Sequence, residues 1–522
     1  MGGVGDRDDR AQAGGVSAAP APPAERDQLG TALMVAFLAA ILRLGMAATI
    51  APFPDETYYW DWSRHLAGGF FDHPPGIAVA IRAGTLLFGD AAFGIRVVPV
   101  LLGTAGVVAA ILLARRVGGQ SAGVRASVVL ACLPLAGAGL VLATPDAPLL
   151  CFGAIALLAV ERAVSPHTSH DSAVGWWALA GLACGAAMAS KYTGVLLPAS
   201  VVLALIIVKP LRRQFATPGP YLAVVLASLV MVPVLRWNAQ HDWASFRFQL
   251  AHGLGPVRGT GIAREGELLG GQLGLVTPIL FVMMAIAVGR ALRPAAAPAL
   301  RLLAIVAAAT FLFFVYSAWR RPAEANWPAP AYIPAVALLA AHGGSVAWRK
   351  WLTAGCVLGA LIVAATYGQA THALLPIPAR KDPMARNAGF AELAARVTVL
   401  RDSLARGRAA PILAAQKYQD ASELAYWIPG HPDVLSINTG YRPNQYDLWP
   451  GLRERAAPGS ALLIVGPNDG ADSALAANPG LSALAPRYRS VTLLDVVALG
   501  RAGSVRERKR IWLLDSLTSV LP

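Results

Sequence analysis

Eleven apolar runs, each close to the length that crosses a bilayer, occupy most of the sequence between residues 30 and 371. About 20 apolar residues span the hydrocarbon core as a helix. The runs lie at 30–52, 92–114, 122–142, 145–163, 174–190, 192–209, 219–236, 270–289, 299–318, 329–347 and 352–371. Charged residues make up 14% of the chain, whereas soluble globular proteins carry about 25%. The sequence therefore predicts an α-helical polytopic membrane protein with about eleven transmembrane helices.

Basic residues gather at alternate ends of these runs, which predicts their orientation. They are Arg115, Arg116, Arg162, Lys209, Arg212, Arg213, Arg290, Arg293, Arg349 and Lys350. Because cytoplasmic loops carry an excess of Lys and Arg, the N-terminus is predicted inside. Residues 1–28 lack an apolar core and are predicted to form a disordered cytoplasmic tail. The apolar stretch 77–89 is too short to span, so we expect a helix at the outer interface.

The apolar pattern ends near residue 375, and this change divides the chain into two folded parts. Residues 29–375 are predicted to form the transmembrane domain, with outer loops at 53–91 and 237–269. Residues 376–522 show alternating helical and strand patterns, with helices expected at 388–404 and 419–427 and strands at 411–415, 434–438 and 461–466. Such alternation is typical of a small α/β domain. With eleven spans, this domain is extracytoplasmic.

Composition and motifs exclude several functions. The net charge is +14 and the isoelectric point about 10.0, yet the basic residues lie at the ends of apolar runs, which suits lipid headgroups better than nucleic acid. No P-loop occurs and no GxGxxG opens a helix after a strand, so no nucleotide cofactor is expected. The four cysteines all lie within apolar runs. They therefore indicate neither a disulfide framework nor a metal site.

Two groups of polar residues stand out in the first outer loop. Asp55 and Glu56 come directly after the first apolar run. Carboxylates next to a membrane are costly to desolvate unless they are paired or functional. Asp72 and His73 combine an oxygen ligand with an imidazole, a pair that could join a divalent metal site. An ordinary solvated loop would also contain such acids, and spacing alone does not separate the two interpretations.

Longer stretches of this loop carry a resemblance to a known family. Pro-Asp-Glu-Thr-Tyr-Tyr at 54–59 and Phe-Asp-His-Pro-Pro at 71–75 resemble the first periplasmic loop of GT-C glycosyltransferases. The similarity is strongest to the bacterial branch that joins protein O-mannosyltransferases and the lipid A aminoarabinose transferase. Supporting stretches lie at 143–148, 190–194, 320–328, and from Tyr418 to 449.

The resemblance implies both a fold and an activity. The fold would be a GT-C transmembrane catalytic domain with a C-terminal periplasmic domain. The enzyme would be an inverting transferase that moves a sugar from a polyprenyl-phosphate donor to a glycan, lipid or protein acceptor. It would be a multi-pass protein of the bacterial inner membrane with its active site on the periplasmic face.

The resemblance also assigns roles to single residues. Asp55 matches the residue regarded as catalytic, with Glu56 beside it. Lys191 matches a lysine that contacts the donor phosphate. Asp72 matches an acid that can ligate a metal such as Zn, Mg or Mn, and His252 lies where a second ligand is expected. His252 could equally be an ordinary interfacial histidine.

Further candidates complete the predicted site. Arg320 and Arg321, at the outer end of a span, are expected to help Lys191 bind the phosphate, although arginines there also snorkel to headgroups. The residues expected to position the acceptor or the loop are Tyr58, Tyr59, His73, Asp146, Glu324 and Asn326.

Two positions depart from the aminoarabinose transferase, which has arginine in place of Tyr58 and lysine in place of His73. Both changes remove positive charge, so they favour a neutral hydroxyl acceptor, which needs a general base. The alternative to an enzyme is a transporter or flippase for a lipid-linked glycan. Such proteins place ionisable groups near the midplane and often contain repeats, whereas here the acids lie at the outer ends and no repeat is evident. A non-catalytic scaffold would leave the loop acids without a role.

Overall fold

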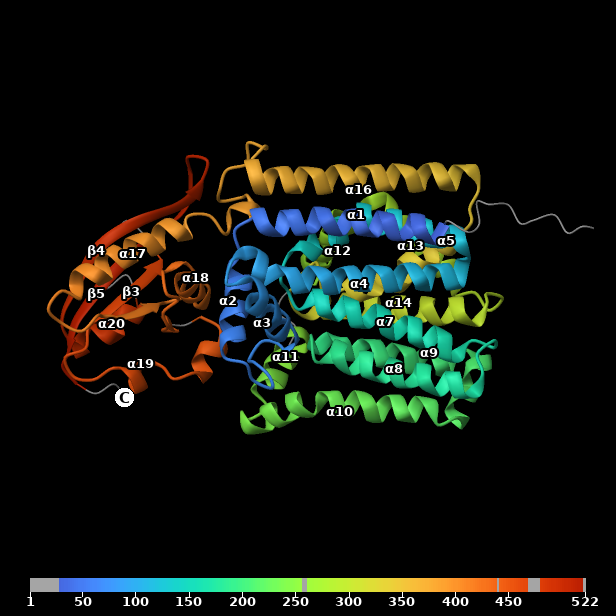
Figure 1. Ribbon diagram of the computed structural model, residues 1–522, viewed down its shortest axis with the longest axis horizontal. Coiled ribbons are helices and arrows are strands. Elements are labelled where there is room, and N and C mark those ends of the chain that lie inside the picture. The colour runs from blue at the N-terminus through green and yellow to red at the C-terminus, as the bar shows by residue number, and fades with distance from the viewer. Residues whose placement is uncertain (1–27, 256–260, 439–440, 468–478, 520–522) are drawn as a thin grey trace, which may run out of the picture.

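The computed structural model describes residues 28–255, 261–438, 441–467 and 479–519. It consists of a long helical bundle with a smaller domain at one end (Figure 1). The predicted tail at 1–28 lies outside the described residues except for Gln28, where the first helix begins.

Helices stand at all eleven predicted runs, but they are not eleven straight spans. Six described helices are long and apolar enough to cross a membrane. They are α1 (Gln28–Thr49), α4 (Ala92–Gly118), α7 (Asp146–Val164), α10 (Gly219–Gln240), α14 (Pro298–Arg320) and α16 (Val346–His372). The two runs at 174–190 and 329–347 contain α8 (His170–Met188) and α15 (Ala329–Ala341).

Three further runs contain sharply bent helix pairs, and counting each pair as one span raises the number to nine. The pairs are α5 (Gln120–Cys132) with α6 (Pro134–Gly137) and η2 (Gly139–Val141), η3 (Tyr192–Val195) and α9 (Leu196–Ile207) with η4 (Lys209–Ala216), and α12 (Ile262–Val276) with α13 (Pro278–Ala291). Pro134 and Pro278 begin the second helices of two pairs. A proline cannot continue the backbone hydrogen bonding of a preceding helix, so these runs break where a straight span was predicted.

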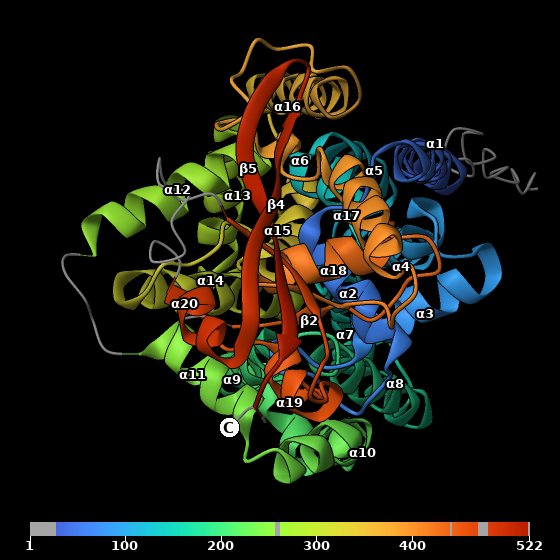
Figure 2. The ribbon, with the colours of Figure 1, turned by 90° about the vertical axis from the view of Figure 1, so that its left-hand side faces the viewer.

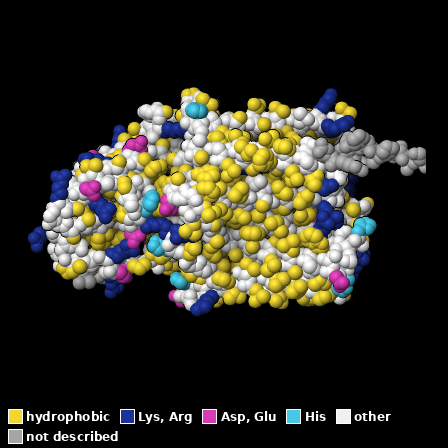
Figure 3. Space-filling view, viewed as in Figure 1, with side chains coloured by type: hydrophobic (Ala, Val, Ile, Leu, Met, Phe, Trp, Pro, Cys, Tyr) yellow, Lys and Arg dark blue, Asp and Glu magenta, His cyan; other side chains and the backbone are white. Residues whose placement is uncertain are grey.

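The bundle presents an apolar belt to its surroundings. Figure 3 shows hydrophobic side chains covering the middle of the bundle, with charged side chains toward its two ends. Phe37 on α1, Leu229 on α10 and Leu361 on α16 are each about 60% exposed. Soluble monomers rarely expose apolar surface on this scale. The chain is therefore a multi-pass membrane protein, as predicted.

Three short helices lie at the bundle end that meets the smaller domain (Figure 1). They are α2 (Pro54–Arg64), α3 (Gly76–Phe88) and α11 (Ala244–Leu254). The start of α2 follows from its sequence, because Pro54 fits the first helical turn and two acids follow it, where the helix dipole favours negative charge. The first outer loop is thus largely helical, and the expected short helix at 77–89 is present as α3.

The C-terminal domain contains a five-stranded mixed sheet in the order β2-β1-β3-β5-β4. The strands are β1 (Ile412–Ala415), β2 (Leu435–Ser436), β3 (Leu462–Pro467), β4 (Tyr488–Arg501) and β5 (Ser504–Leu517). Strands β1, β2 and β3 pair in parallel, and β3, β5 and β4 pair antiparallel. The helices include α17 (Phe390–Leu404), α18 (Tyr418–Trp427), α19 (Leu452–Arg455) and α20 (Pro479–Leu484). The predicted helices and first three strands are therefore present, with β2 shorter than expected.

The long hairpin of β4 and β5 was not predicted. Its turn residues Ala502 and Gly503 both have positive φ, at 50° and 76°, as a tight two-residue hairpin turn requires. Charged residues run through the first half of β5, Ser-Val-Arg-Glu-Arg-Lys-Arg, and they hide the apolar alternation that marks a strand.

The C-terminal domain docks onto α2 through buried polar contacts. Thr57 and Ser422 on α18 place their hydroxyl oxygens 3.1 Å apart. The Tyr446 hydroxyl donates to Asp61 at 2.6 Å. Since α2 carries the predicted catalytic acids, the domain directly supports the candidate site.

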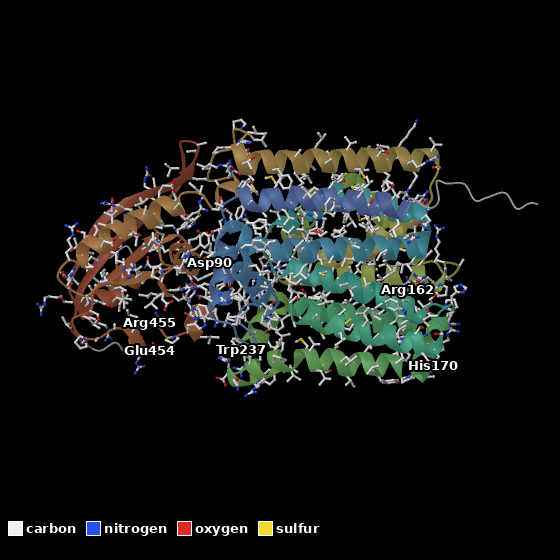
Figure 4. All side chains as sticks on the ribbon, viewed as in Figure 1. Asp90, Arg162, His170, Trp237, Glu454 and Arg455 are labelled. Carbon is white, nitrogen blue, oxygen red and sulfur yellow. The ribbon has the colours of Figure 1, made fainter. Side chains whose placement is uncertain are left out.

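The two ends of the bundle differ, and this leads to a test of topology. In Figure 4, Arg162 and His170 lie at the end opposite the C-terminal domain, whereas Asp90 and Trp237 lie next to that domain. Reporters fused after Ser165 and after Ala379 should therefore report opposite sides of the membrane, with Ser165 cytoplasmic. Paired alkaline phosphatase and fluorescent protein fusions measure this, and the same side for both positions would contradict the arrangement.

Candidate functional site

The first turn of α2 directs its two acids into different surroundings. Glu56 is 1% exposed and its oxygens accept from Arg96 Nε at 2.7 Å and Nη2 at 2.6 Å. The backbone N–H groups of Phe53 and Ala143 donate to the same carboxylate at 3.0 and 2.8 Å. Four donors leave the Glu56 carboxylate little capacity to act on a substrate. Its contacts therefore favour a structural role, whereas a catalytic role was expected.

Arg96 extends this contact to the end of the first span. Its guanidinium also donates to the carbonyls of Ala47, Ile50 and Ala51. The carbonyls in the last turn of a helix have no partner within the helix. At the end of α1, Arg96 supplies hydrogen-bond donors to such carbonyls. The Glu56–Arg96 pair therefore fixes α1, α2 and α4 relative to one another.

Asp55 is the acid that stays free. Its carboxylate accepts no hydrogen bond within the described residues, although its neighbour Glu56 accepts four. Burial raises the pKa of Asp55 above its usual value, while Arg386 and Arg442 act in the opposite direction. A half-buried carboxylate with a raised pKa and no partner is suited to accept a proton.

Asp72 is bound by two residues from distant parts of the chain. The Tyr58 hydroxyl donates to Asp72 Oδ2 at 2.8 Å, and Arg442 Nη1 forms an ion pair with Oδ1. Tyr58 in turn accepts from the backbone N–H of Gln445 at 2.7 Å. Burial, followed by the Asp72 charge, raises the pKa of Tyr58 well above its usual value. Tyr58 therefore stays a neutral donor that orients Asp72.

These contacts bear on the predicted metal site. Both oxygens of Asp72 are engaged by Tyr58 and Arg442, and the ring of His252 stacks on Phe248 with centroids 5.2 Å apart. Among the described residues no group of three or more His, Cys, Asp or Glu side chains is arranged to hold a metal ion. Asp72 and His252 therefore do not fit a metal in this arrangement, and no step is derived through one.

Lys191 lies where two spans meet and is held by an acid. Its Nζ contacts Asp146 Oδ1 at 2.7 Å, and the side-chain amide of Asn326 donates to Asp146 Oδ2 at 2.5 Å. All three residues were predicted site residues, and the structure brings them together from η3, α7 and the segment between α14 and α15. An ammonium has three donors, so Lys191 retains two for a ligand.

His73 is a buried ring whose surroundings include the charged side chains of Lys191 and Arg442. Burial lowers its pKa well below the usual value, and Lys191, Arg442 and His252 lower it further. These three side chains come from different elements of the chain. Its Nδ1 is buried without a partner among the described residues. The neutral ring lies in a positive potential that would attract an anion.

Tyr59 faces the acids from α2. Burial raises its pKa well above the usual value, with Asp55 and Asp72 adding to the effect. Burial likewise raises the pKa of Tyr418, on α18, to about 12. Both hydroxyls therefore remain protonated and available as donors at the same face as Asp55.

The outer end of α14 supplies the remaining candidates. Arg320 donates to the Leu254 carbonyl at 3.3 Å and to the Tyr316 hydroxyl at 3.2 Å. Arg321 has a buried Nε without a partner in the described part of the chain. Burial lowers the pKa of His252, and among smaller effects Arg321 lowers it and the exposed Glu324 raises it. Arg321 and Glu324 therefore lie near His252, whereas Arg320 is engaged at the edge of the site.

Comparisons with known proteins bear on the fold of the chain. Residues 72–237 match the family described as dolichyl-phosphate-mannose-protein mannosyltransferase. The ArnT structure of Cupriavidus metallidurans bound to undecaprenyl phosphate superposes with a TM-score of 0.64 at 17% identity, covering 93% of this chain and 97% of that one. The chain has the GT-C fold.

Two curated relatives extend the likeness at the level of sequence. The chain is 31% identical over 303 residues to the lipid A galacturonosyltransferase RgtD of Rhizobium johnstonii. This alignment covers 58% of this chain and 62% of that protein. It is also 31% identical over 198 residues to the undecaprenyl phosphate-alpha-4-amino-4-deoxy-L-arabinose arabinosyl transferase of Pseudomonas aeruginosa. That alignment covers 34% of this chain and 35% of the relative. The aligned part thus spans less than two thirds of either relative.

The candidate site also contains residues that the sequence did not single out. Arg442 reaches Asp72 across 370 residues of chain, and no local pattern marks it. Arg96 carried a signal, because an arginine within an otherwise apolar run must have a partner when buried. Arg386, an exposed residue of the C-terminal domain, acts on Asp55 only through the docking of that domain.

The Glu56–Arg96 pair generates a prediction about stability. Glu56→Gln should lower the free energy of unfolding by about 3–5 kcal/mol, because it leaves the guanidinium buried without its counter-charge. Thermal unfolding of the detergent-solubilised protein measures the change. Asp55→Asn is the matched control: the same chemical change one residue earlier breaks no hydrogen bond within the described residues and should leave the unfolding temperature near that of the wild type. Equal stability of the two variants would contradict the structural role of Glu56.

Proposed function

We propose that this protein is an inverting glycosyltransferase that moves a sugar from a polyprenyl-phosphate donor to a hydroxyl group of a lipid, glycan or protein acceptor. The observation that carries the proposal is the free carboxylate of Asp55 beside a group of converging cations. A base and cations that can bind a phosphate are what transfer from a phosphate leaving group to a hydroxyl requires.

In the proposed reaction the acceptor oxygen attacks the anomeric carbon of the donor sugar from the face opposite the phosphate. The bond between this carbon and the phosphate oxygen breaks, and its electron pair leaves with the polyprenyl phosphate. The acceptor proton passes to Asp55. The one new bond at carbon forms opposite the broken bond, so the configuration inverts.

The leaving phosphate gains negative charge as the bond breaks, and cations fixed in advance lower this barrier. Lys191 offers two free N–H donors while Asp146 and Asn326 hold it in place. Arg321, with its unpartnered Nε, is the second candidate ligand. The pairing of Lys191 with Asp146 keeps the lysine oriented when no donor is bound.

The names of the relatives support this assignment of substrates. One is named for galacturonosyl transfer to lipid A, another for an undecaprenyl-phosphate aminoarabinose substrate, and the ArnT structure contains undecaprenyl phosphate. We extend to this chain the polyprenyl-phosphate-linked donor and a location in the bacterial inner membrane. The basic residues at the bundle end opposite the site favour a periplasmic active site.

Asp55→Asn tests the base. The variant keeps the size of the side chain but cannot accept the proton, so turnover should fall by at least ~10²-fold, the usual contribution of acid–base catalysis. Binding of undecaprenyl phosphate should be unchanged. Transfer from the lipid-linked sugar, followed by mass spectrometry of the product, measures the rate.

The pH dependence sharpens this test. Because Asp55 must be deprotonated to act, the wild-type rate should decline as the pH falls through its raised pKa, and the residual rate of Asp55→Asn should lack this decline. Near-normal turnover in Asp55→Asn together with its loss in Asp72→Asn would assign the base to Asp72 instead.

Lys191→Gln tests the phosphate site. Glutamine can still donate to Asp146 but has no charge, and losing one charged hydrogen bond costs roughly 1.5–3 kcal/mol, so binding of undecaprenyl phosphate should weaken about 10- to 100-fold. Lys209→Gln, at the other end of the bundle, is the matched control and should bind normally. Unchanged binding in Lys191→Gln would reduce the lysine to a structural partner of Asp146.

A further inference from the structure

A cavity opens where the ends of α1 and α16 meet the C-terminal domain. Its volume is about 590 Å³, within the range of small-molecule sites. Its walls are the C-terminal ends of α1 and α16, the start of α17, and the turn of the β4–β5 hairpin. Figure 1 shows these elements side by side at the junction between the bundle and the domain.

The position of this cavity suits a molecule anchored in the membrane. Both helices end there, so the cavity lies level with the end of the apolar belt. Large apolar side chains such as Leu42 on α1 and Leu361 on α16 are 51% and 62% exposed, and they offer a surface for lipid tails. Thr371, His372 and Glu392 add polar groups at the cavity itself.

The charges in the cavity distinguish it from the phosphate site. Arg501 is the only Lys or Arg among the lining residues that the structure describes. Its guanidinium is already engaged, because it donates to the carbonyls of Gln369 and Ala370 at 2.7 and 2.6 Å. Glu392 is exposed and accepts no hydrogen bond from a described residue. Among the described lining residues the Glu392 carboxylate therefore has no free Lys or Arg beside it, and a carboxylate accepts hydrogen bonds from hydroxyl groups.

The cavity also leads toward Asp55. Asn387 lines it and donates to the Ala51 carbonyl at 2.7 Å, four residues before Asp55 in the chain. Arg386, the preceding residue, is close enough to act on the Asp55 carboxylate. Ala51 and Asn387 thus line the cavity close in sequence to Asp55 and to the exposed Arg386.

The donor cations approach Asp55 from elsewhere. Lys191 precedes α9, and Arg321 follows α14. Figures 1 and 2 place α9 and α14 away from α1 and α16. A donor phosphate at Lys191 would thus leave the cavity beside α1 and α16 unoccupied.

We propose that this cavity binds the neutral, hydroxyl-bearing headgroup of a membrane glycolipid and presents it to Asp55 as the acceptor. This proposal rests on the proposed function and adds to it the location and chemical class of the acceptor. Trp427, which lines the cavity beside Glu392, supplies an aromatic face next to the polar groups, a combination that suits a sugar ring.

Ala391→Trp tests the cavity by filling it. Ala391 lines the cavity and is exposed, so the larger side chain should occupy the space without disturbing a core. The matched control is Ala395→Trp, one turn along the same helix, also exposed and outside the cavity lining. Native mass spectrometry of the full chain would compare retention of monoglucosyl diacylglycerol with phosphatidic acid of the same acyl chains.

The proposal expects the wild type and Ala395→Trp to retain the neutral glycolipid in preference to phosphatidic acid. Ala391→Trp should weaken this retention by about tenfold or more, since a filled pocket buries little of the ligand. Glu392→Gln, a milder change, should weaken it by about threefold through the loss of a charged acceptor. Retention unchanged by Ala391→Trp, or a preference for phosphatidic acid, would overturn the proposal.

Undecaprenyl phosphate binding separates this proposal from the proposed function. Ala391→Trp should bind undecaprenyl phosphate as the wild type does, whereas Lys191→Gln should not. If Ala391→Trp loses undecaprenyl phosphate instead, the cavity belongs to the donor and the acceptor proposal fails, although the proposed function stands. If undecaprenyl phosphate binding is normal in Lys191→Gln, the phosphate assignment fails independently of the cavity.

Discussion

The buried ion pair between Glu56 and Arg96 is the interaction on which the site depends. It joins the first turn of α2 to α4, and the same guanidinium holds the carbonyls at the end of α1. A buried ion pair is costly unless its geometry and remaining hydrogen bonds are satisfied, and here the donors from Phe53 and Ala143 complete it. With Glu56 fully engaged, the adjacent Asp55 is fixed in orientation while its own carboxylate stays free. Of the two neighbouring acids, Glu56 therefore has the structural contacts, and Asp55 is the one we propose as the base.

The C-terminal domain completes the site. Arg442 pairs with Asp72, Gln445 holds Tyr58, and Tyr446 binds Asp61. Each contact joins a loop of this domain to α2 or to the segment that follows it. The cationic environment of His73 includes Arg442 as well as Lys191 from the bundle. The electrostatic potential at the candidate site is therefore a property of both domains together, and the hydrogen bonds that hold the domains also position the candidate residues.

Several features could be predicted because their signals are local. The apolar runs located the helices, and Asp55, Asp146, Lys191 and Asn326 were recognised from short motifs. The structure brings the last three into one hydrogen-bonded group. Other expectations depend on the partners of each side chain, which no local signal reveals. Asp72 is engaged by Tyr58 and Arg442 and does not fit a metal there, and Arg320 is engaged at the edge of the site. The bends at Pro134 and Pro278 shortened spans that apolarity alone predicted to be straight.

The sequence by itself determined that this chain spans a membrane, which end of the bundle carries the acids, and that a second domain follows residue 375. These properties follow from transfer free energies, which add along the chain and need no knowledge of contacts. Only the tertiary structure decided which of two adjacent acids is free, and which cations face it. Which acid stays free depends on which charged groups are buried together. Their burial depends in turn on packing between segments up to 370 residues apart.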